Sequence, residues 1–132
     1  MRKKIMGITA IVAILATIGL ITTSTASALP QPAEIERETM GACSSGARWN
    51  LDLEKEYGVI DINFEIDATT PGEKWTIVVE RNGSRVLRVS QVADLEGEVD
   101  VDHLVRDRAG TNRISVSATS AGGQTCRGSL RI

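Results

Sequence analysis

VIDINFEIDA, residues 59–68, alternates apolar and polar side chains without a break. Its apolar positions are Ile60, Ile62, Phe64 and Ile66, and its polar positions are Asp61, Asn63, Glu65 and Asp67. A period of two residues is typical of a strand with one buried and one solvated face, as in antiparallel sheets. The same alternation occurs in RWNLDLEKE (48–56), EGEVDVDHLV (96–105) and NRISVSAT (112–119). We therefore expect an antiparallel β fold.

A hairpin is predicted where EKWTIVVE (73–80) and SRVLRVS (84–90) flank Asn82-Gly83. This dipeptide suits a type I′ turn, in which both central residues have positive φ. A two-residue loop places Glu80 opposite Arg85, but it also places Arg88 on the same face as Trp75. The sequence therefore does not decide which face of this hairpin packs in the core. With QTCRGSLRI (124–132) as the last strand, about seven short strands predict an all-β sandwich of undetermined strand order.

The first 28 residues predict a secretory signal peptide. Three cations (Arg2, Lys3, Lys4) precede an apolar run, and Ala26-Ser27-Ala28 has the form of a cleavage site. We expect cleavage after Ala28 and secretion, with no membrane span in the mature chain. An uncleaved N-terminal anchor is the alternative, because the apolar run is near the short limit for a membrane span.

Loss of Arg2, Lys3 and Lys4 leaves 12 of the 15 basic residues against 17 acidic ones, a net charge near −5. This balance disfavours a nucleic acid or another polyanion as the partner. We expect a monomer with an unknown extracellular protein or cell-surface component as its partner.

The mature chain contains two cysteines, Cys43 and Cys126. An exported chain meets an oxidising compartment, so a Cys43–Cys126 disulfide is predicted; free thiols or an intermolecular bridge are the alternatives. Neither cysteine belongs to a C-x-x-C pair, so no zinc site is signalled. Residues 29–42 are rich in Pro and Glu and predict a disordered linker. The predicted domain is therefore 43–132, with Cys43 ahead of its first strand.

The stretch AGTNRISVSATSAGGQTCRGSLRI (109–132) resembles the last two strands of bacterial immunoglobulin-like and fibronectin type III-like modules. The matching positions are Gly110, Asn112, Ile114, Val116, Ala118, Thr119 and Gly123. The resemblance implies an immunoglobulin-like β-sandwich. The mature region also resembles small exported domains of Gram-positive, actinobacterial type, and this second resemblance implies no activity. Antibody-type domains bridge their second and sixth strands, whereas Cys43 and Cys126 stand near the two ends of this domain.

Several residues invite a chemical role. His103 follows Asp100 and Asp102, but no nucleophile motif accompanies it and one histidine cannot build a zinc site, so we predict no catalytic or metal-binding residue. The row Asp61, Asn63, Glu65 and Asp67 predicts a solvated strand face. Weak calcium binding with Glu54 or Glu56 stays open.

Two features could bind a partner. Arg106, Arg108 and Arg113 surround one loop, and loops on a rigid sandwich commonly carry binding residues. Trp49 and Tyr57 are the candidate exposed aromatics. We predict a non-catalytic extracellular binding or adhesion module without a cofactor; a secreted enzyme inhibitor or small effector with a rigid exposed loop is the alternative.

Overall fold

The computed structural model describes residue 19 and residues 33–132. Apart from residue 19, the predicted signal peptide with its cleavage site and the first part of the predicted linker lie outside the described residues. The described residues contain no helix that is long and apolar enough to cross a membrane.

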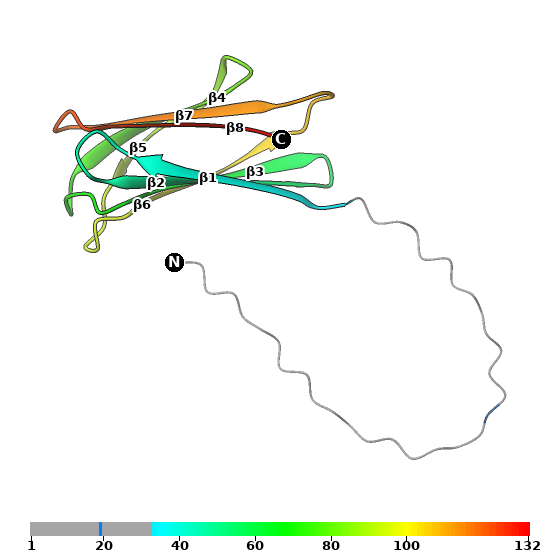
Figure 1. Ribbon diagram of the computed structural model, residues 1–132, viewed down its shortest axis with the longest axis horizontal. Coiled ribbons are helices and arrows are strands. Elements are labelled where there is room, and N and C mark those ends of the chain that lie inside the picture. The colour runs from blue at the N-terminus through cyan, green and yellow to red at the C-terminus, as the bar shows by residue number, and fades with distance from the viewer. Residues whose placement is uncertain (1–18, 20–32) are drawn as a thin grey trace. The chain divides into compact units, whose positions relative to one another are not determined.

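Residues 33–132 form an all-β sandwich of two antiparallel sheets (Figure 1). The eight strands are β1 (Ile35–Ala42), β2 (Arg48–Glu56), β3 (Val59–Asp67), β4 (Lys74–Arg81), β5 (Ser84–Val92), β6 (Val99–Arg106), β7 (Arg113–Ser120) and β8 (Thr125–Arg131). One sheet has the order β1-β2-β3-β6 and the other β5-β4-β7-β8. In constant-type immunoglobulin domains the second strand pairs with the first and fifth, whereas β2 pairs with β1 and β3. The confirmed prediction is therefore the antiparallel β-sandwich.

The strand β1 corrects the predicted linker. Residues 35–42 pair along their whole length with β2, so the domain has eight strands and Cys43 follows the first of them. The alternation is hard to see in the sequence because β1 is an edge strand, and only Ile35, Thr39 and Gly41 are partly buried in it. An edge strand gains a full ladder of hydrogen bonds on one side with little apolar burial.

The β4–β5 hairpin contains a β-bulge that decides its core face. Asn82 and Gly83 have φ values of 49° and 84°, which fits the predicted type I′ turn, and Glu80 lies opposite Arg85. The register then shifts between Val79 and Glu80, so that Val79 pairs with Leu87 instead of Val86. The extra residue brings Leu87 and Val89 onto the core side with Trp75, and it turns Arg88 outward beside Val78.

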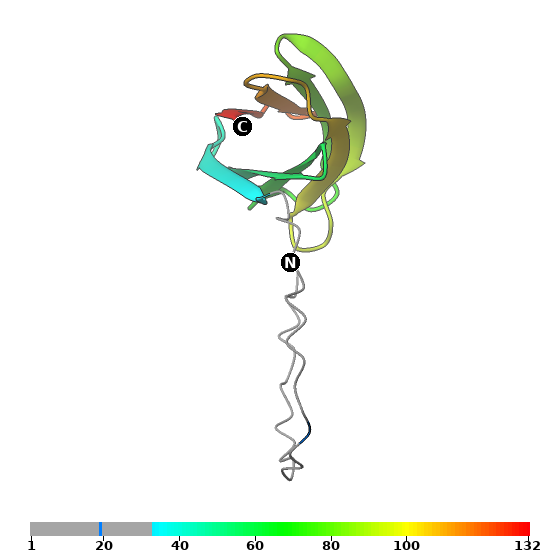
Figure 2. The same ribbon diagram turned by 90° about the vertical axis from the view of Figure 1, so that its right-hand side faces the viewer.

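The predicted disulfide closes one side of the sandwich. Cys43 and Cys126 are bonded, with Cα atoms 4.4 Å apart. They connect the edge strands of the two sheets, β1 and β8, which lie side by side in Figure 2. Backbone contacts join the same segments, because the Ser44 amide donates to the Thr125 carbonyl oxygen.

Trp49 fills the core next to this closure, which corrects its assignment as an exposed aromatic. Its side chain is only 8% exposed and its ring centroid is 6.3 Å from that of Phe64. Glycine is required on both sides of the indole: a Cβ atom on Gly41 or Gly128 would lie 2.7 or 2.6 Å from its ring carbons. Those glycines are each two residues from a bonded cysteine, on β1 and β8.

Candidate binding surfaces

The outward positions of the two sheets carry opposite charge. We call the outer side of β1-β2-β3-β6 the acidic face. Its outward carboxylates are Glu36, Glu38, Asp52, Glu54, Glu56, Asp61, Glu65, Asp67, Asp100 and Asp102. Its outward cations on these strands are Arg48 and Arg106, which lie at strand ends.

Like charges stand directly opposite each other on the acidic face. Glu36 pairs with Glu54, Glu54 with Asp61, and Glu65 with Asp100. The Asn63 amide group donates to Asp100 Oδ1 at 2.9 Å and to Asp102 Oδ1 at 2.8 Å, which relieves part of this repulsion. Burial raises the pKa of the Glu65 carboxyl above its usual 4.5, and the charges of Asp100 and Asp67 raise it further.

We call the outer side of β5-β4-β7-β8 the arginine face. Its outward cations are Lys74, Arg85, Arg88, Arg113, Arg127 and Arg131, and its outward hydroxyl residues are Thr76, Ser90, Ser115, Ser117, Thr119, Thr125 and Ser129. Among the described outward residues of these strands Glu80 is the one carboxylate, and it lies opposite Arg85. Strand alternation sorts the charges by sheet, so the net charge of the chain describes neither face. The net charge therefore does not disfavour a polyanionic partner at the arginine face.

Two arrangements of polar side chains stand out on the arginine face. One cross-strand row, Ser90, Thr76, Thr119 and Thr125, consists entirely of hydroxyl residues. Arg113 and Arg131 lie directly opposite each other, and Arg113 Nε donates to Ser129 Oγ at 3.0 Å. Two opposed guanidinium groups beside a hydroxyl can donate several hydrogen bonds to the oxygen atoms of one phosphate or carboxylate group.

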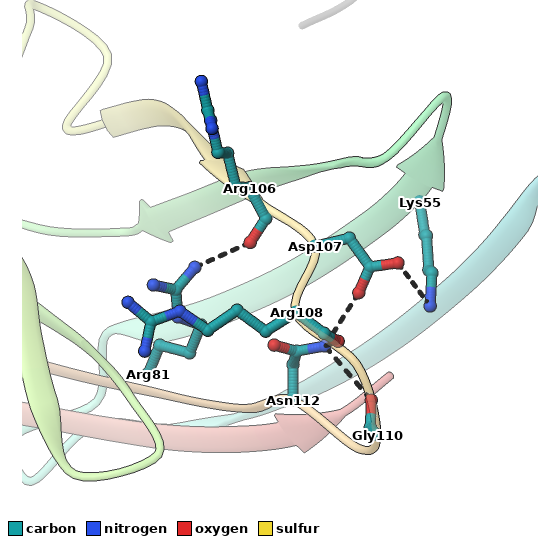
Figure 3. A network of polar contacts seen from close by, with 7 residues as sticks. All are labelled: Lys55, Arg81, Arg106, Asp107, Arg108, Gly110 and Asn112. Atoms are coloured by element: carbon teal, nitrogen blue, oxygen red, sulfur yellow. Dashed lines mark hydrogen bonds and ion pairs between the residues drawn. The ribbon is translucent and has the colours of Figure 1, made fainter.

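The structure does not bring the three arginines of the predicted binding loop together. Arg106 projects from the acidic face and Arg113 from the arginine face, because the loop between them crosses from one sheet to the other. Figure 3 shows the Arg106 and Arg108 side chains pointing in different directions. Arg81 Nη1 donates to the Arg106 carbonyl oxygen at 2.7 Å.

Asn112 holds this loop in shape. Its side chain is fully buried, and its Nδ2 donates to Asp107 Oδ1 at 2.9 Å and to the Arg108 carbonyl oxygen at 3.1 Å (Figure 3). Asp107 also pairs with Lys55 Nζ at 2.8 Å, so its carboxylate ties the loop to β2 and is not paired with the arginines. The pattern G-x-N in the sequence marks Asn112 as part of a motif, although only the structure gives its role.

Tyr57 is exposed, as predicted, and it borders a hollow. Its side chain is 68% exposed in the turn between β2 and β3, next to a hollow of about 180 Å³. The hollow is lined by Glu54, Glu56, Tyr57, Val59, Asp61 and Leu104. The sequence places Tyr57 between two strands, but Leu104 comes from β6 and joins it only through the sheet pairing.

The acidic residues near His103 do not form a site with it. His103 faces inward opposite Ile62, whereas Asp100 and Asp102 face outward beside Asn63 and Glu65. Strand alternation therefore separates the imidazole from both carboxylates. Carboxylate oxygens approach within 4.8 Å of one another in two described groups, Glu34-Glu54-Glu56 and Asp94-Glu96-Glu98. The second group lies in a tight turn where Asp94 Oδ1 already accepts the Glu96 and Glu98 amides.

That turn also presents an apolar side chain. Leu95 is 95% exposed at its tip. The Asp94 amide donates to the Glu98 carbonyl oxygen and the Gly97 amide to the Asp94 carbonyl oxygen, and Thr69 braces the turn by donating to the Gly97 carbonyl oxygen. The turn is therefore fixed while its tip projects into solvent.

Comparison with known proteins adds no relative: no family model, no curated protein and no solved structure matches this chain.

Proposed function

We propose that the chain is an exported, non-catalytic binding domain that lays its arginine face against an extended anionic polymer. The observation that carries the proposal is the segregation of charge, with six cations and one carboxylate on the outward strand positions of β5-β4-β7-β8. Export is supported by the signal-like N-terminal sequence and by the disulfide, which persists in oxidising compartments.

The type of cation supports a binding role. Five of the six cations are arginines, which are enriched at interfaces, whereas lysine is depleted there. Guanidinium groups bind phosphate and carboxylate groups through two parallel hydrogen bonds, and the neighbouring hydroxyls supply further donors. A face that only had to remain soluble would gain nothing from arginine over lysine.

The spacing of the cations favours a polymer over a small anion. Arg88 and Arg127 occupy the same cross-strand row with β4 and β7 between them, so their backbones are about 14 Å apart. Arg127 and Arg131 are four residues apart on β8, again about 14 Å. No single small anion spans these distances, but a chain with repeated anionic groups does. The acidic face points away from such a chain and disfavours contact through that side.

Binding to immobilised polymers tests the proposal. The protein, purified with its disulfide intact, is passed over polyphosphate, polygalacturonate and neutral dextran, and its affinity is measured at several salt concentrations. We expect retention on an anionic polymer that weakens as salt increases. The double variant Arg88→Gln/Arg127→Gln should lose about 1 kcal/mol of binding free energy for each of its two exposed charge contacts. Together these losses weaken the affinity about 25-fold. Glu38→Gln on the acidic face is the matched control and leaves binding unchanged or slightly tighter.

The alternatives give different results in the same experiment. Equal losses in the arginine and Glu38 variants would exclude a specific face. If inorganic phosphate competes as well as polyphosphate at the same concentration of phosphate groups, the site would be reduced to the Arg113–Arg131 pair. Preferred binding to vesicles of anionic lipid would replace the polymer by a membrane surface.

The Leu95 turn favours a second function, inhibition of an extracellular enzyme. A rigid, convex turn with one exposed apolar side chain fits a substrate pocket with little ordering on binding. Inhibition assays with proteases that accept leucine test this function. It requires inhibition by the wild type that Leu95→Asp removes, and absence of inhibition across such proteases contradicts it.

A further inference from the structure

The hollow beside Tyr57 lies on the acidic face, opposite the proposed polymer-binding surface, and its lining combines three kinds of side chain. Glu54, Glu56 and Asp61 supply carboxylates, and Val59 and Leu104 supply apolar surface. Leu104 is 63% exposed on a face whose other outward positions are mainly acidic. Tyr57, an exposed aromatic residue in the turn between β2 and β3, completes the lining.

Tyr57 is retained in an unfavourable backbone conformation. Its φ is 48° and that of Gly58 is 76°, the combination of a type I′ turn. A left-handed conformation costs an L-residue with a large side chain about 1–2 kcal/mol, and asparagine is the residue that this position favours. Since the ring is exposed, core packing does not account for a tyrosine here. Backbone strain at an exposed aromatic is a feature that functional positions share.

The charges around the hollow favour a cation. Glu54 and Asp61 stand directly opposite each other, and Glu34 and Glu56 bring further carboxylate oxygens to within 4.8 Å of Glu54. A calcium ion would require six to eight oxygen ligands, whereas much of this lining is aliphatic or aromatic. An organic cation uses both parts of the lining.

We propose that this hollow binds a primary ammonium group on an aliphatic stem, the chemistry of a lysine side chain of a partner. The ammonium group donates hydrogen bonds to the Glu54, Glu56 and Asp61 carboxylates. Its stem packs on Leu104 and Val59, and the Tyr57 ring adds a cation–π contact. The inference is independent of the arginine face, and a domain with both sites would connect an anionic polymer to a lysine-bearing partner.

Nuclear magnetic resonance titration tests this site. The labelled protein with its disulfide intact is titrated with Nα-acetyl-lysine amide and with the uncharged Nα-acetyl-norleucine amide. We expect saturable shifts for the lysine compound alone, centred on the amides of Tyr57, Gly58 and Leu104. Equal shifts with norleucine, or no saturable shift with lysine, would overturn the proposal.

Variants separate binding from folding. Tyr57→Asn keeps the turn and relieves its strain, so we expect an unchanged or higher melting temperature. We also expect the lysine compound to bind about fivefold more weakly, because the cation–π contact is lost. Leu104→Thr weakens binding, whereas Met40→Thr, at a similarly exposed apolar position of the same face, does not. Tyr57→Asn with wild-type affinity would overturn the site. Calcium chloride that shifts the same amides and displaces the lysine compound at a lower concentration would replace it by a metal site.

Discussion

The two outer faces of the sandwich are built by the same rule and carry opposite charge. On each sheet, every second residue points to solvent, yet the acidic face repeatedly places carboxylates opposite carboxylates. Among its described strand positions, the arginine face has one such pair of like charges, Arg113 and Arg131, and otherwise mixes cations with hydroxyl groups. The first arrangement is destabilising, since like charges directly opposite on a sheet repel each other. The comparison teaches that a moderate net charge of the whole chain hides two strongly charged surfaces.

The comparison depends on two sheets held back to back, and removal of the disulfide is the strongest way to break it. Cys43→Ala/Cys126→Ala opens a loop closed across 83 positions, and the chain-entropy model gives a loss of about 4–5 kcal/mol in the free energy of unfolding. Urea unfolding measures this loss. An unchanged midpoint of urea unfolding, in the variant or in the reduced wild type, would show that the disulfide does not stabilise the sandwich.

The next largest effect separates the two aromatic residues at the ends of β2. Trp49→Ala leaves a cavity between Gly41 and Gly128 and should lower the free energy of unfolding by about 3–5 kcal/mol. Tyr57→Ala removes an exposed ring and should change it by less than about 0.5 kcal/mol. Similar losses for both variants, in the same urea experiment, would contradict their placement in core and solvent.

The smallest effect sharpens the contrast between the faces. Glu65→Gln removes a repulsion with Asp100 and should stabilise the protein by about 0.2–1 kcal/mol at pH 7. Glu80→Gln removes an attraction to Arg85 and should destabilise it by a similar amount. Thermal unfolding at matched salt compares the two variants, and changes of the same sign would contradict the assignment of charge to the faces.

The pH dependence of the Glu65 effect follows from its raised pKa. The folded state holds the Glu65 proton more tightly than the unfolded state, so this group favours folding below pH 4.5, and its contribution is lost as the pH rises through the folded pKa. The gain from Glu65→Gln should therefore be present at pH 7 and absent below pH 4.5. A gain that persists in acid would assign it to packing instead of charge.

Sequence periodicity predicts most of this fold because burial on one side of a strand leaves a direct trace. Ile60, Ile62 and Phe64 are buried as expected, and the two cysteines form the predicted bond. The strand β1 leaves little trace because it gains backbone hydrogen bonds more than apolar burial. The bulge at Val79 leaves none, since an extra residue in one strand changes the facing of Arg88 without any local sequence signal.

The candidate sites were harder to predict because they depend on which strands pair. Carboxylates concentrate before residue 68 and between 94 and 102, and arginines between 81 and 88 and after 105, so a signal for the two faces is present in the sequence. It becomes a surface only when β6 joins β3 and β7 joins β4. The same pairing sends Arg106 and Arg113 to opposite faces and brings Leu104 to Tyr57.

The central claim, that the two outer faces differ in the sign of their charge, is tested most directly by charged paramagnetic probes. A cationic and an anionic nitroxide of equal size are added separately, and the relaxation of each backbone amide is compared between them. The cationic probe should broaden the amides of Asp61 and Asn63 more strongly, and the anionic probe those of Ser117 and Arg127. Equal broadening of both pairs by both probes would contradict the account.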